Sequence, residues 1–518
     1  MTSPPETKPS TNFSASPRAK QAQPVWSSDT AILIYIALAT ILTQLVCGGR
    51  FGFHRDELAT LEDARHLAWG YVAYPPITPF FGRLSLILFG TSVSGFRFFA
   101  AVAQAESVVL TGLMARELGG RRGAQLVAAA AAIPFCLVGG ALMQYVAFDY
   151  LCWVLTAYFV IRMLKSENPR WWLAIGVAIG LGMMTKYTMG FFALGVTVGV
   201  LLTRTRRHLA SKWLWMGVVV SLLIFLPNLL WQAHHHFISL DFLHTIHERD
   251  VRIGRAQGFL PDQLKFTLLG FPLWLAGLYC YSLSKAGSRF RMLGWMYIVP
   301  LILFLVAKGR GYYMGPAYPM LYAAGSVWGE QRLQSLGRAA AAKIRSLAWI
   351  ALAADILLVG AIAIPPTHIN STLWNFASKN NGDLLEEVGW PELAQTIAQI
   401  RDSLPAEDRS HFGVLAANYG EAGAINLYGP ALGLPPAISG VNSFWAYGYP
   451  SPPPQTLIVI GFSEGFRQRN FTSCQIGGHY PNPYNIENEE SRDHPDIYVC
   501  RGLRQSWPDF WSDFQYYG

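Results

Sequence analysis

The chain has 518 residues, a formal net charge of +8 and a mean hydropathy of +0.26. Charged residues make up 14% of the chain, against about 25% in typical soluble domains, while hydrophobic residues reach 52%. This composition excludes a disordered protein and argues against a soluble globular enzyme. The apolar residues come in blocks close to the roughly 20 residues that cross a bilayer as a helix. The composition therefore predicts an all-α protein with many membrane spans.

The N-terminal segment is the first region of distinct composition. Residues 1–28 are polar and rich in Pro, Ser and Thr, which predicts a disordered cytoplasmic tail. A tail of this length before the first apolar block is not typical of a cleavable signal peptide, so the first span is expected to remain as an anchor.

Residues 29–365 form a predicted membrane domain with about eleven transmembrane helices. With the N-terminus in the cytoplasm, the inner connections hold 20 Lys and Arg residues and the outer connections about half as many. The positive-inside rule favours this orientation, so the basic charge indicates topology and no nucleic-acid partner. The predicted spans are 29–48, 95–115, 124–142, 147–164, 171–186, 188–203, 213–233, 264–283, 292–307, 313–329 and 346–364.

Residues 366–518 contain no segment long enough to span a membrane and are predicted to form a small α/β domain outside it. Residues 411–418, 455–462 and 496–500 have the continuous apolar runs of buried strands. The segments WPELAQTIAQIRDSL and GEAGAINLYG, which flank the first strand, are typical of helices.

The six cysteines divide by compartment. Cys474 and Cys500 are the pair in the outer domain, where the environment is oxidising, and a bridge between them is the prediction. The alternative is two free thiols. The remaining four lie in or beside spans as small apolar packing residues, and they are Cys47, Cys136, Cys152 and Cys280.

The first outer loop is unusually acidic. Four carboxylates fall within eight residues, namely Asp56, Glu57, Glu62 and Asp63. Apolar residues at helical spacing predict an amphipathic helix on the membrane surface with its acids toward water. The alternative interpretation is that Asp56 and Glu57 only cap this helix.

Several short motifs follow one another on the predicted outer face. An Asp-Glu pair follows the first span, and a Gly-Tyr-x-x-Tyr-Pro-Pro stretch ends at Pro76. Further along come Phe148-Asp149-Tyr150, Met184-Thr185-Lys186 and Lys308-Gly309-Arg310-Gly311-Tyr312-Tyr313. In this order, over about residues 30–365, the chain resembles the GT-C glycosyltransferases related to protein O-mannosyltransferases and to bacterial aminoarabinose lipid A transferases.

The resemblance implies the GT-C fold and transfer of a single sugar, with inversion, from a polyprenyl-phosphate donor to an acceptor hydroxyl on the outer face. Asp56 would be the general base, with Glu57 supporting it and Asp149 as a second active-site acid. The donor phosphate would face cations and a tyrosine, namely Lys186, Lys308, Arg310 and Tyr312. Tyr74 and His66 would lie in the acceptor loop.

The same residues have plainer interpretations. Asp149 can act as a helix N-cap or in a local ion pair, and Lys186 can simply extend toward the membrane interface. A Lys and an Arg at positions 308 and 310 are exceptions to the positive-inside rule, which favours phosphate binding for them.

A histidine-rich stretch between the seventh and eighth spans raises the question of a divalent metal. Five of the twelve histidines lie at positions 234–247, and His247 with Glu57 is the candidate ligand pair. The relatives' ligand is a Glu close to the Tyr-Pro pair, whereas this chain has Ala73 beside Tyr74. This departure slightly favours the alternative, in which the histidines bind headgroups or waters.

Two other functions compete with sugar transfer. A transporter or flippase should show repeated halves and charges near the middle of the membrane, whereas here acids and cations gather on one outer face. A block-transferring oligosaccharide ligase is the runner-up within the enzymes. The predicted location is the bacterial inner membrane, with a polyprenyl-phosphate sugar, a glycan, lipid or protein acceptor, and membrane lipids as partners.

Overall fold

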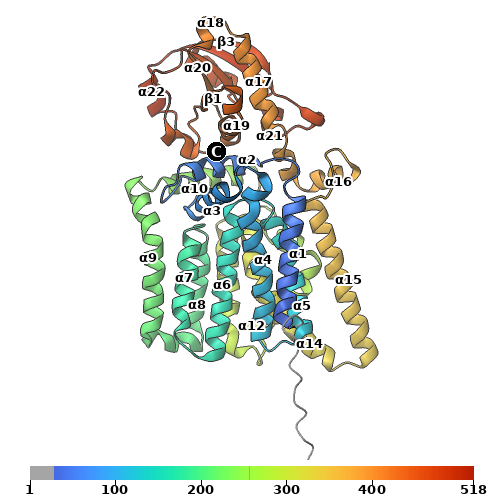
Figure 1. Cartoon of the computed structure of the whole chain (residues 1–518). Coiled ribbons are helices and arrows are strands. Elements are labelled where there is room, and N and C mark those ends of the chain that lie inside the picture. The colour runs from blue at the N-terminus through green and yellow to red at the C-terminus, as the bar shows by residue number, and fades with distance from the viewer. Residues whose placement is uncertain (1–27, 256) are drawn as a thin grey trace, which may run out of the picture.

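The computed structural model describes residues 28–255 and 257–518. A bundle of upright helices carries the C-terminal domain at one end, and short helices lie flat between the two parts (Figure 1). The predicted N-terminal tail falls in residues 1–27, outside the described residues.

The helices of the membrane domain run from the N-terminal anchor to α15. They are α1 (Asp29–Cys47), α2 (Arg55–Arg65), α3 (Ile77–Phe89), α4 (Val93–Glu117), α5 (Arg122–Gly139), α6 (Tyr145–Ser166), α7 (Trp171–Met183), α8 (Met189–Leu202), α9 (Lys212–His234), α10 (Ile238–Arg252), α11 (Phe259–Thr267), α12 (Phe271–Ser282), α13 (Arg291–Val306), α14 (Tyr318–Gln334) and α15 (Arg338–Ala363). Short 3-10 helices connect them at η2 (Arg204–Ala210), η3 (Leu268–Gly270), η4 (Ser288–Phe290) and η5 (Gly311–Ala317).

The predicted apolar segments all coincide with helices, which confirms the polytopic all-α membrane fold. Among the described residues, eight helices are long and apolar enough to cross a membrane. The predicted spans at 171–186, 188–203 and 313–329 correspond to the shorter helices α7, α8 and α14. Apolar runs of this kind become helical because only a helix satisfies every backbone hydrogen bond within one segment in lipid.

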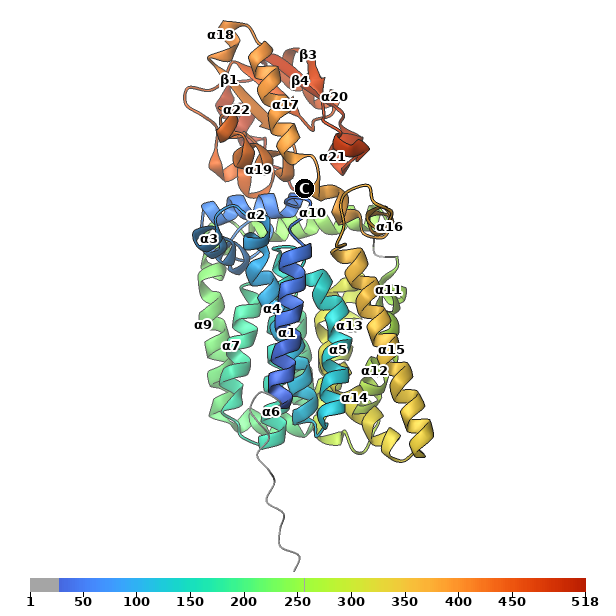
Figure 2. The same cartoon turned by 45° about the vertical axis from the view of Figure 1, so that its right-hand side comes forward.

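The outer connections fold into helices. The first outer loop contains α2 and α3, and the histidine-rich connection forms α10, which lies across the end of the bundle in Figure 2. These flat helices form a layer between the bundle and the C-terminal domain.

The C-terminal domain contains one four-stranded mixed sheet with strand order β1-β2-β4-β3. β1 is parallel to β2, and β4 is antiparallel to both β2 and β3. The strands are β1 (Phe412–Ala416), β2 (Thr456–Ile460), β3 (Phe471–His479) and β4 (Asp496–Leu503). The helical elements are α16 (Thr372–Asn380), η6 (Gly382–Glu387), α17 (Trp390–Ser403), α18 (Ala406–Arg409), α19 (Tyr419–Tyr428), η7 (Pro430–Leu432), η8 (Asn442–Tyr447), α20 (Glu464–Asn470), η9 (Pro483–Asn485), α21 (Glu489–Asp493) and α22 (Trp507–Ser512).

The small α/β domain is confirmed, but one of its strands was not predicted. The three predicted strands match β1, β2 and β4, which are largely buried. β3 lies at the sheet edge with most of its side chains exposed, so its sequence lacks a continuous apolar run. Periodicity alone does not identify an edge strand of this kind.

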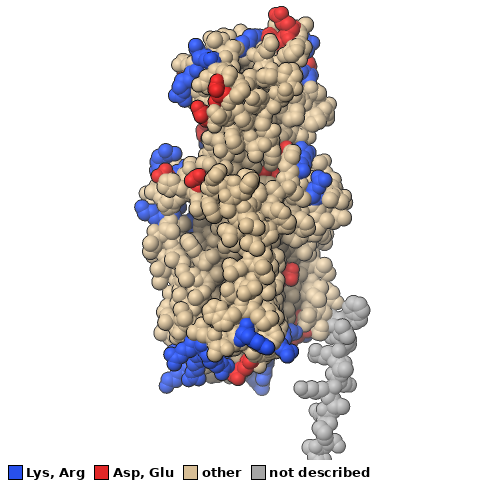
Figure 3. Space-filling view, turned by 90° about the vertical axis from the view of Figure 1, so that its left-hand side faces the viewer, with Lys and Arg blue, Asp and Glu red and all other residues tan. Residues whose placement is uncertain are grey.

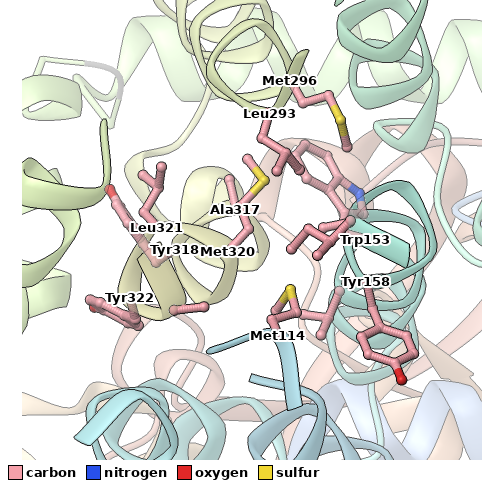
Figure 4. Close-up of a cluster of buried hydrophobic side chains, with 14 of the residues drawn as sticks. Met114, Trp153, Tyr158, Leu293, Met296, Ala317, Tyr318, Met320, Leu321 and Tyr322 are labelled. Carbon is pink, nitrogen blue, oxygen red and sulfur yellow. The ribbon is translucent and has the colours of Figure 1, made fainter. Parts of the chain in front are cut away.

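Two hydrophobic clusters hold the molecule together. The first fills the bundle, where Trp153, Met296 and Leu321 meet from three different helices (Figure 4). The second cluster joins the two parts, because Leu58 and Leu61 of α2 are buried together with residues of the C-terminal domain, including Trp390. The C-terminal domain is therefore packed firmly onto the outer loop.

The contact between α2 and α19 is close. A Cβ atom at Gly423 of α19 would lie 2.8 Å from the backbone of Leu58, so this approach requires a glycine. Three of the four acids of α2 are buried, namely Glu57, Glu62 and Asp63. The expectation that these acids face water was wrong, because α2 is enclosed between the membrane domain, where Glu57 meets Arg97, and the C-terminal domain, where Asp63 meets Tyr447.

The predicted bridge between Cys474 and Cys500 is present. The two cysteines are directly opposite each other on β3 and β4. The bridge ties the exposed edge strand to the buried strand beside it.

We expect Cys474→Ser to lower the stability of the C-terminal domain by roughly 3 kcal/mol, because the bridge closes a loop in the unfolded chain. Thermal unfolding of the purified protein measures this effect, with Cys47→Ser as the control for a free cysteine. An unchanged unfolding temperature under oxidising conditions would contradict the prediction.

Charged side chains are unevenly distributed over the surface. In Figure 3, Lys and Arg gather at the end of the membrane domain away from the C-terminal domain, and a belt with few charges separates them from the other end. The belt matches the apolar faces of the long helices, which expose residues such as Leu222 and Leu357.

Candidate active site

A cavity of about 420 Å³ lies at the junction of the bundle, the flat helices and the C-terminal domain. The membrane domain supplies most of its wall, and the C-terminal domain supplies the remainder through η8, Tyr419 and Gly518. Six predicted site residues from distant parts of the sequence line this cavity, namely Asp56, Tyr74, Lys186, His247, Lys308 and Arg310.

Asp56 is the half-exposed carboxylate of the cavity, with 41% of its side chain accessible. Its two oxygens are held from opposite sides. The Gln144 amide donates a hydrogen bond to Oδ2 at 2.9 Å, and the Tyr419 hydroxyl donates one to Oδ1 at 2.8 Å. The helix cap is the side chain of His54, which accepts from the Asp56 amide. Asp56 is therefore free of a capping role and points into the cavity.

Glu57, the next residue, lies in a different environment. Its carboxylate is fully buried and accepts hydrogen bonds from Arg97 Nε at 2.8 Å and from the Met143 amide at 2.8 Å. It also accepts from the His54 amide, which completes a capping box. Glu57 does not line the cavity and its oxygens are occupied by these partners, so the structure contradicts its prediction as a metal ligand. Its support of Asp56 stays a prediction.

Lys186 extends between α7 and α8 into a cage of tyrosines. Its ammonium lies 3.9 Å from the ring centre of Tyr313, 5.1 Å from Tyr145 and 5.4 Å from Tyr312. Such faces stabilise a cation when water is excluded. The cage holds the charge at the cavity wall.

Asp149 lies on α6 behind Lys186 and does not line the cavity. Its side chain is almost completely buried and accepts a hydrogen bond from the Trp153 indole at 3.1 Å. The charges of Asp149 and Lys186 attract each other. The prediction that Asp149 shares the catalytic surface with Asp56 was wrong, and its position is that of a buried counter-charge for Lys186.

Arg310 forms a two-pronged ion pair with Asp250 of α10, at 2.6 and 3.0 Å. Arg249 and Arg255 lie 3.8 and 3.6 Å from the same carboxylate. Lys308 is exposed at the cavity and has no carboxylate within ion-pair distance in the described part of the chain. One acid is thus shared by three guanidinium groups.

The tyrosines divide between the cavity and its supports. Tyr313 lines the cavity, whereas the predicted phosphate ligand Tyr312 does not and packs against Tyr313 and Lys186. Tyr74 lines the cavity, but its hydroxyl donates to Asp63 at 2.6 Å. Of these two neighbouring tyrosines, only Tyr313 is therefore placed to contact a ligand in the cavity.

His66 lies outside the cavity, contrary to the prediction of an acceptor contact. Its ring stacks on Tyr447 of η8 at 4.4 Å, and its Nδ1 lies 3.4 Å from Glu62. The residue belongs to the contact between the outer loop and the C-terminal domain.

Asp63 takes part in the same contact between the outer loop and the C-terminal domain. Its carboxyl accepts hydrogen bonds from the hydroxyls of Tyr74 at 2.6 Å and Tyr447 at 3.0 Å. Burial raises the pKa of Asp63 from 3.8 to about 7, and these two hydroxyl donors oppose only part of that rise.

A raised folded-state pKa means that folding is favoured by protonation. The stabilisation is present below about pH 4 and is lost as the pH rises toward 7. We expect the unfolding temperature of the native protein relative to Asp63→Asn to fall over this range and to stay constant above it. Thermal unfolding of both proteins at pH 4.5, 6 and 8 measures the difference, and a difference independent of pH would contradict the assigned pKa.

The proposed metal ligands do not meet. His247 lines the cavity, while Glu57 is buried against Arg97. Among residues 28–255 and 257–518, no group of three or more His, Cys, Asp or Glu side chains is arranged to hold a metal ion. The residues present do not fit a metal site.

The cavity carries an excess of positive charge. Six of its lining residues are Lys or Arg and three are Asp, and one of these three, Asp63, has a raised pKa. The cationic residues are Arg55, Lys186, Arg249, Arg255, Lys308 and Arg310. Such a wall favours an anionic ligand such as a phosphate.

The fold and the cavity define a class of polytopic membrane protein in which a C-terminal domain covers a site at one end of the helix bundle. Solved structures share this architecture. ArnT from Cupriavidus metallidurans in the apo state superposes with a TM-score of 0.57 at 16% identity, over 91% of this chain and 98% of that chain. The same protein bound to undecaprenyl phosphate gives 0.54, over 90% and 97%. The GT-C fold is therefore confirmed.

Sequence comparison identifies the group more closely. A family model described as dolichyl-phosphate-mannose-protein mannosyltransferase matches residues 73–231. An undecaprenyl phosphate-alpha-4-amino-4-deoxy-L-arabinose arabinosyl transferase of Pseudomonas fluorescens is 30% identical over 51% of this chain and 49% of its own length. A lipid A galacturonosyltransferase of Rhizobium johnstonii is 25% identical over 31% of this chain and 34% of its own length.

These matches confirm the resemblance to the protein mannosyltransferase and aminoarabinose transferase group of GT-C glycosyltransferases. The chain spans at most about half the length of the curated relatives described here.

Three site residues were not identified from the sequence. Tyr419 and Gln144 hold Asp56, and Asp250 holds Arg310. Asp250 was visible as one acid in a histidine-rich connection, but Tyr419 lies 363 residues from its partner and carries no local signal.

Proposed function

We propose that this protein transfers a single sugar from a polyprenyl-phosphate donor to an acceptor hydroxyl at the outer face of the membrane, with Asp56 as general base. The observation that carries the proposal is the cavity itself, in which a half-exposed carboxylate and a cluster of cations share one wall. The names of the relatives and the undecaprenyl phosphate bound to the Cupriavidus protein support the same donor class.

The chemistry of the wall orients the donor. Lys186, Lys308 and Arg310 suit the phosphate, because cations stabilise the charge that develops on a departing phosphate. Asn442 and Ser443, on the side of the C-terminal domain, are uncharged and suit sugar hydroxyls. Asp56 lies in the same cavity, where an acceptor hydroxyl would attack.

The reaction follows from this placement. The acceptor oxygen forms a bond to the anomeric carbon while the bond from that carbon to the phosphate oxygen breaks. Asp56 takes the acceptor proton, and the phosphate leaves as an anion beside the cations. A single displacement inverts the anomeric configuration. Gln144 and Tyr419 keep the carboxylate of Asp56 in one orientation.

The lipid chain has an apolar route to the same cavity. Phe191 of α8 and Phe304 of α13 belong to bundle helices, have ring centres 5.0 Å apart and line one side of the cavity. A polyprenyl chain would leave the cavity along this side while its phosphate stays near Lys186. We place the cavity outside the inner membrane of a bacterium and the N-terminus inside, as the basic residues at the opposite end favour.

The carboxylate of Asp250 would compete with the donor phosphate for Arg310. Its ion pair with Arg310 occupies Nε and Nη2, the edge of the guanidinium that offers two parallel N–H donors to a phosphate. Binding of the donor therefore includes exchange of a carboxylate for a phosphate at Arg310, with Arg249 and Arg255 available to keep Asp250 neutralised.

Incubation of the purified full-length protein with labelled polyprenyl-phosphate sugars and bacterial envelope fractions tests the proposal. The donors should include an amino sugar, a uronic acid and a neutral hexose, because the relatives' names cover these three types. We expect one donor to label a lipid, glycan or protein acceptor with one sugar per product. Transfer of several linked sugars would favour the block transferase, and movement of intact donor across vesicles without product would favour a flippase.

Lys186→Met tests the donor-phosphate contact. We expect at least about tenfold weaker binding of undecaprenyl phosphate, because a charge-assisted contact to the phosphate is lost. Lys265→Met, an exposed lysine of α11 that does not line the cavity, is the matched control. Equal binding by both variants would show that the phosphate lies elsewhere.

A further inference from the structure

A second cavity of about 600 Å³ lies at the opposite end of the membrane domain. It is enclosed by the end of α8, the start of η2, the end of α12, and η4 with the start of α13. Its volume falls within the range of about 300 to 1,000 Å³ that is typical of small-molecule sites. Nothing in the sugar-transfer proposal uses this cavity.

Three guanidinium groups line it, those of Arg204, Arg206 and Arg291. Among the described residues, none of the three has a carboxylate within 4.0 Å. Two nearby arginines at the same end, Arg207 and Arg289, share the carboxylate of Glu167. The three arginines of the cavity have no such counter-charge, so their positive charge is available to an anionic ligand.

Two further features fit a ligand with an anionic head and an apolar tail. The hydroxyl oxygen of Ser282 lies in the cavity wall, shielded from solvent, and has no hydrogen-bond partner in the described part of the chain. Leu202, Trp295 and Ile298 form an apolar side, and Leu202 is exposed to the surroundings of the bundle. Tryptophan at this depth is typical of the level of lipid headgroups.

We propose that this cavity binds the headgroup of an anionic phospholipid of the inner leaflet. The arginines would meet the phosphate, Ser282 would donate a hydrogen bond to it, and the apolar side would contact the first part of the acyl chains. A free phosphate ion shares the head chemistry but would leave the apolar side without a partner.

The test measures lipid retention, so it is independent of whether the protein transfers sugar. Native mass spectrometry of the purified full-length protein compares phosphatidylglycerol with zwitterionic phosphatidylcholine. The variant R204Q/R206Q/R291Q is matched by R338Q/K343Q/R345Q, which removes the same charge from α15 at the same end outside the cavity. We expect at least about tenfold weaker retention of phosphatidylglycerol in the first variant only.

Three outcomes would overturn the inference. Equal weakening in both variants would mean diffuse attraction to a basic surface, and equal retention of both lipids would mean no anionic selectivity. Arginine-dependent thermal stabilisation by inorganic phosphate without phosphatidylglycerol retention would mean a soluble ligand. Should a triple variant fail to insert, Arg206→Glu with Arg338→Glu as its control measures the same difference with one residue.

Discussion

Asp56→Asn is expected to lower sugar transfer by about 100- to 10,000-fold while the protein keeps its fold, because an amide cannot accept the proton of the acceptor. The substitution preserves the shape of the side chain between Gln144 and Tyr419, so binding of undecaprenyl phosphate should change little. Turnover and donor binding measured on the same purified variant separate the two effects.

Asp241→Asn is the matched control, since Asp241 is an exposed carboxylate of α10 that does not line the cavity. Tyr419→Phe and Gln144→Leu should each reduce turnover less than Asp56→Asn, because one holding contact remains. If Asp56→Asn keeps more than about a tenth of native turnover, Asp56 is not the general base.

Arg97→Met is expected to destabilise the outer part of the protein by about 3–5 kcal/mol, because it leaves buried carboxylates without their cation. Arg97 bonds to Glu57 through two nitrogens, at 2.8 and 2.5 Å, and reaches Glu387 at 3.3 Å. Its removal would place two carboxylates together in the interior. Burial and the nearby charge of Glu57 already raise the pKa of Glu387 to about 8, against the opposing effect of Arg97.

Thermal unfolding measures this loss, with Arg83→Met as control, since Arg83 is an exposed arginine of α3. Glu57→Gln should also lower the unfolding temperature, while the fraction that remains folded keeps much of its turnover. This is the reverse of the pattern expected for Asp56→Asn. If Glu57→Gln instead lost turnover without losing stability, Glu57 would have a direct part in catalysis.

The proposed exchange at Arg310 involves two elements of the site. Arg310 is paired with Asp250 of α10, and η5 begins directly after Arg310 at Gly311. Binding of the donor phosphate to Arg310 would therefore change the contacts between α10 and the start of η5. The tyrosine cage around Lys186, by contrast, is formed before any ligand arrives.

The sequence alone was sufficient to predict the apolar helices of the bundle, their order, and the common face of Asp56, Lys186, Lys308 and Arg310. The reason is that apolar blocks in a bilayer permit little except helices, and alternation then assigns each connection to one side. The disulfide also followed from the sequence, because Cys474 and Cys500 are the two cysteines of the outer domain.

Tertiary structure decided what the individual side chains do. Asp56 and Glu57 are adjacent, but successive residues of a helix point about 100° apart, so one enters the cavity and the other the interior. The packing of α19 against α2 decides which of the two carboxylates faces the cavity and which faces the interior. No local pattern in the first outer loop contains that information. The same holds for Tyr419 on Asp56 and Asp250 on Arg310, whose contacts arise only when distant segments are packed together.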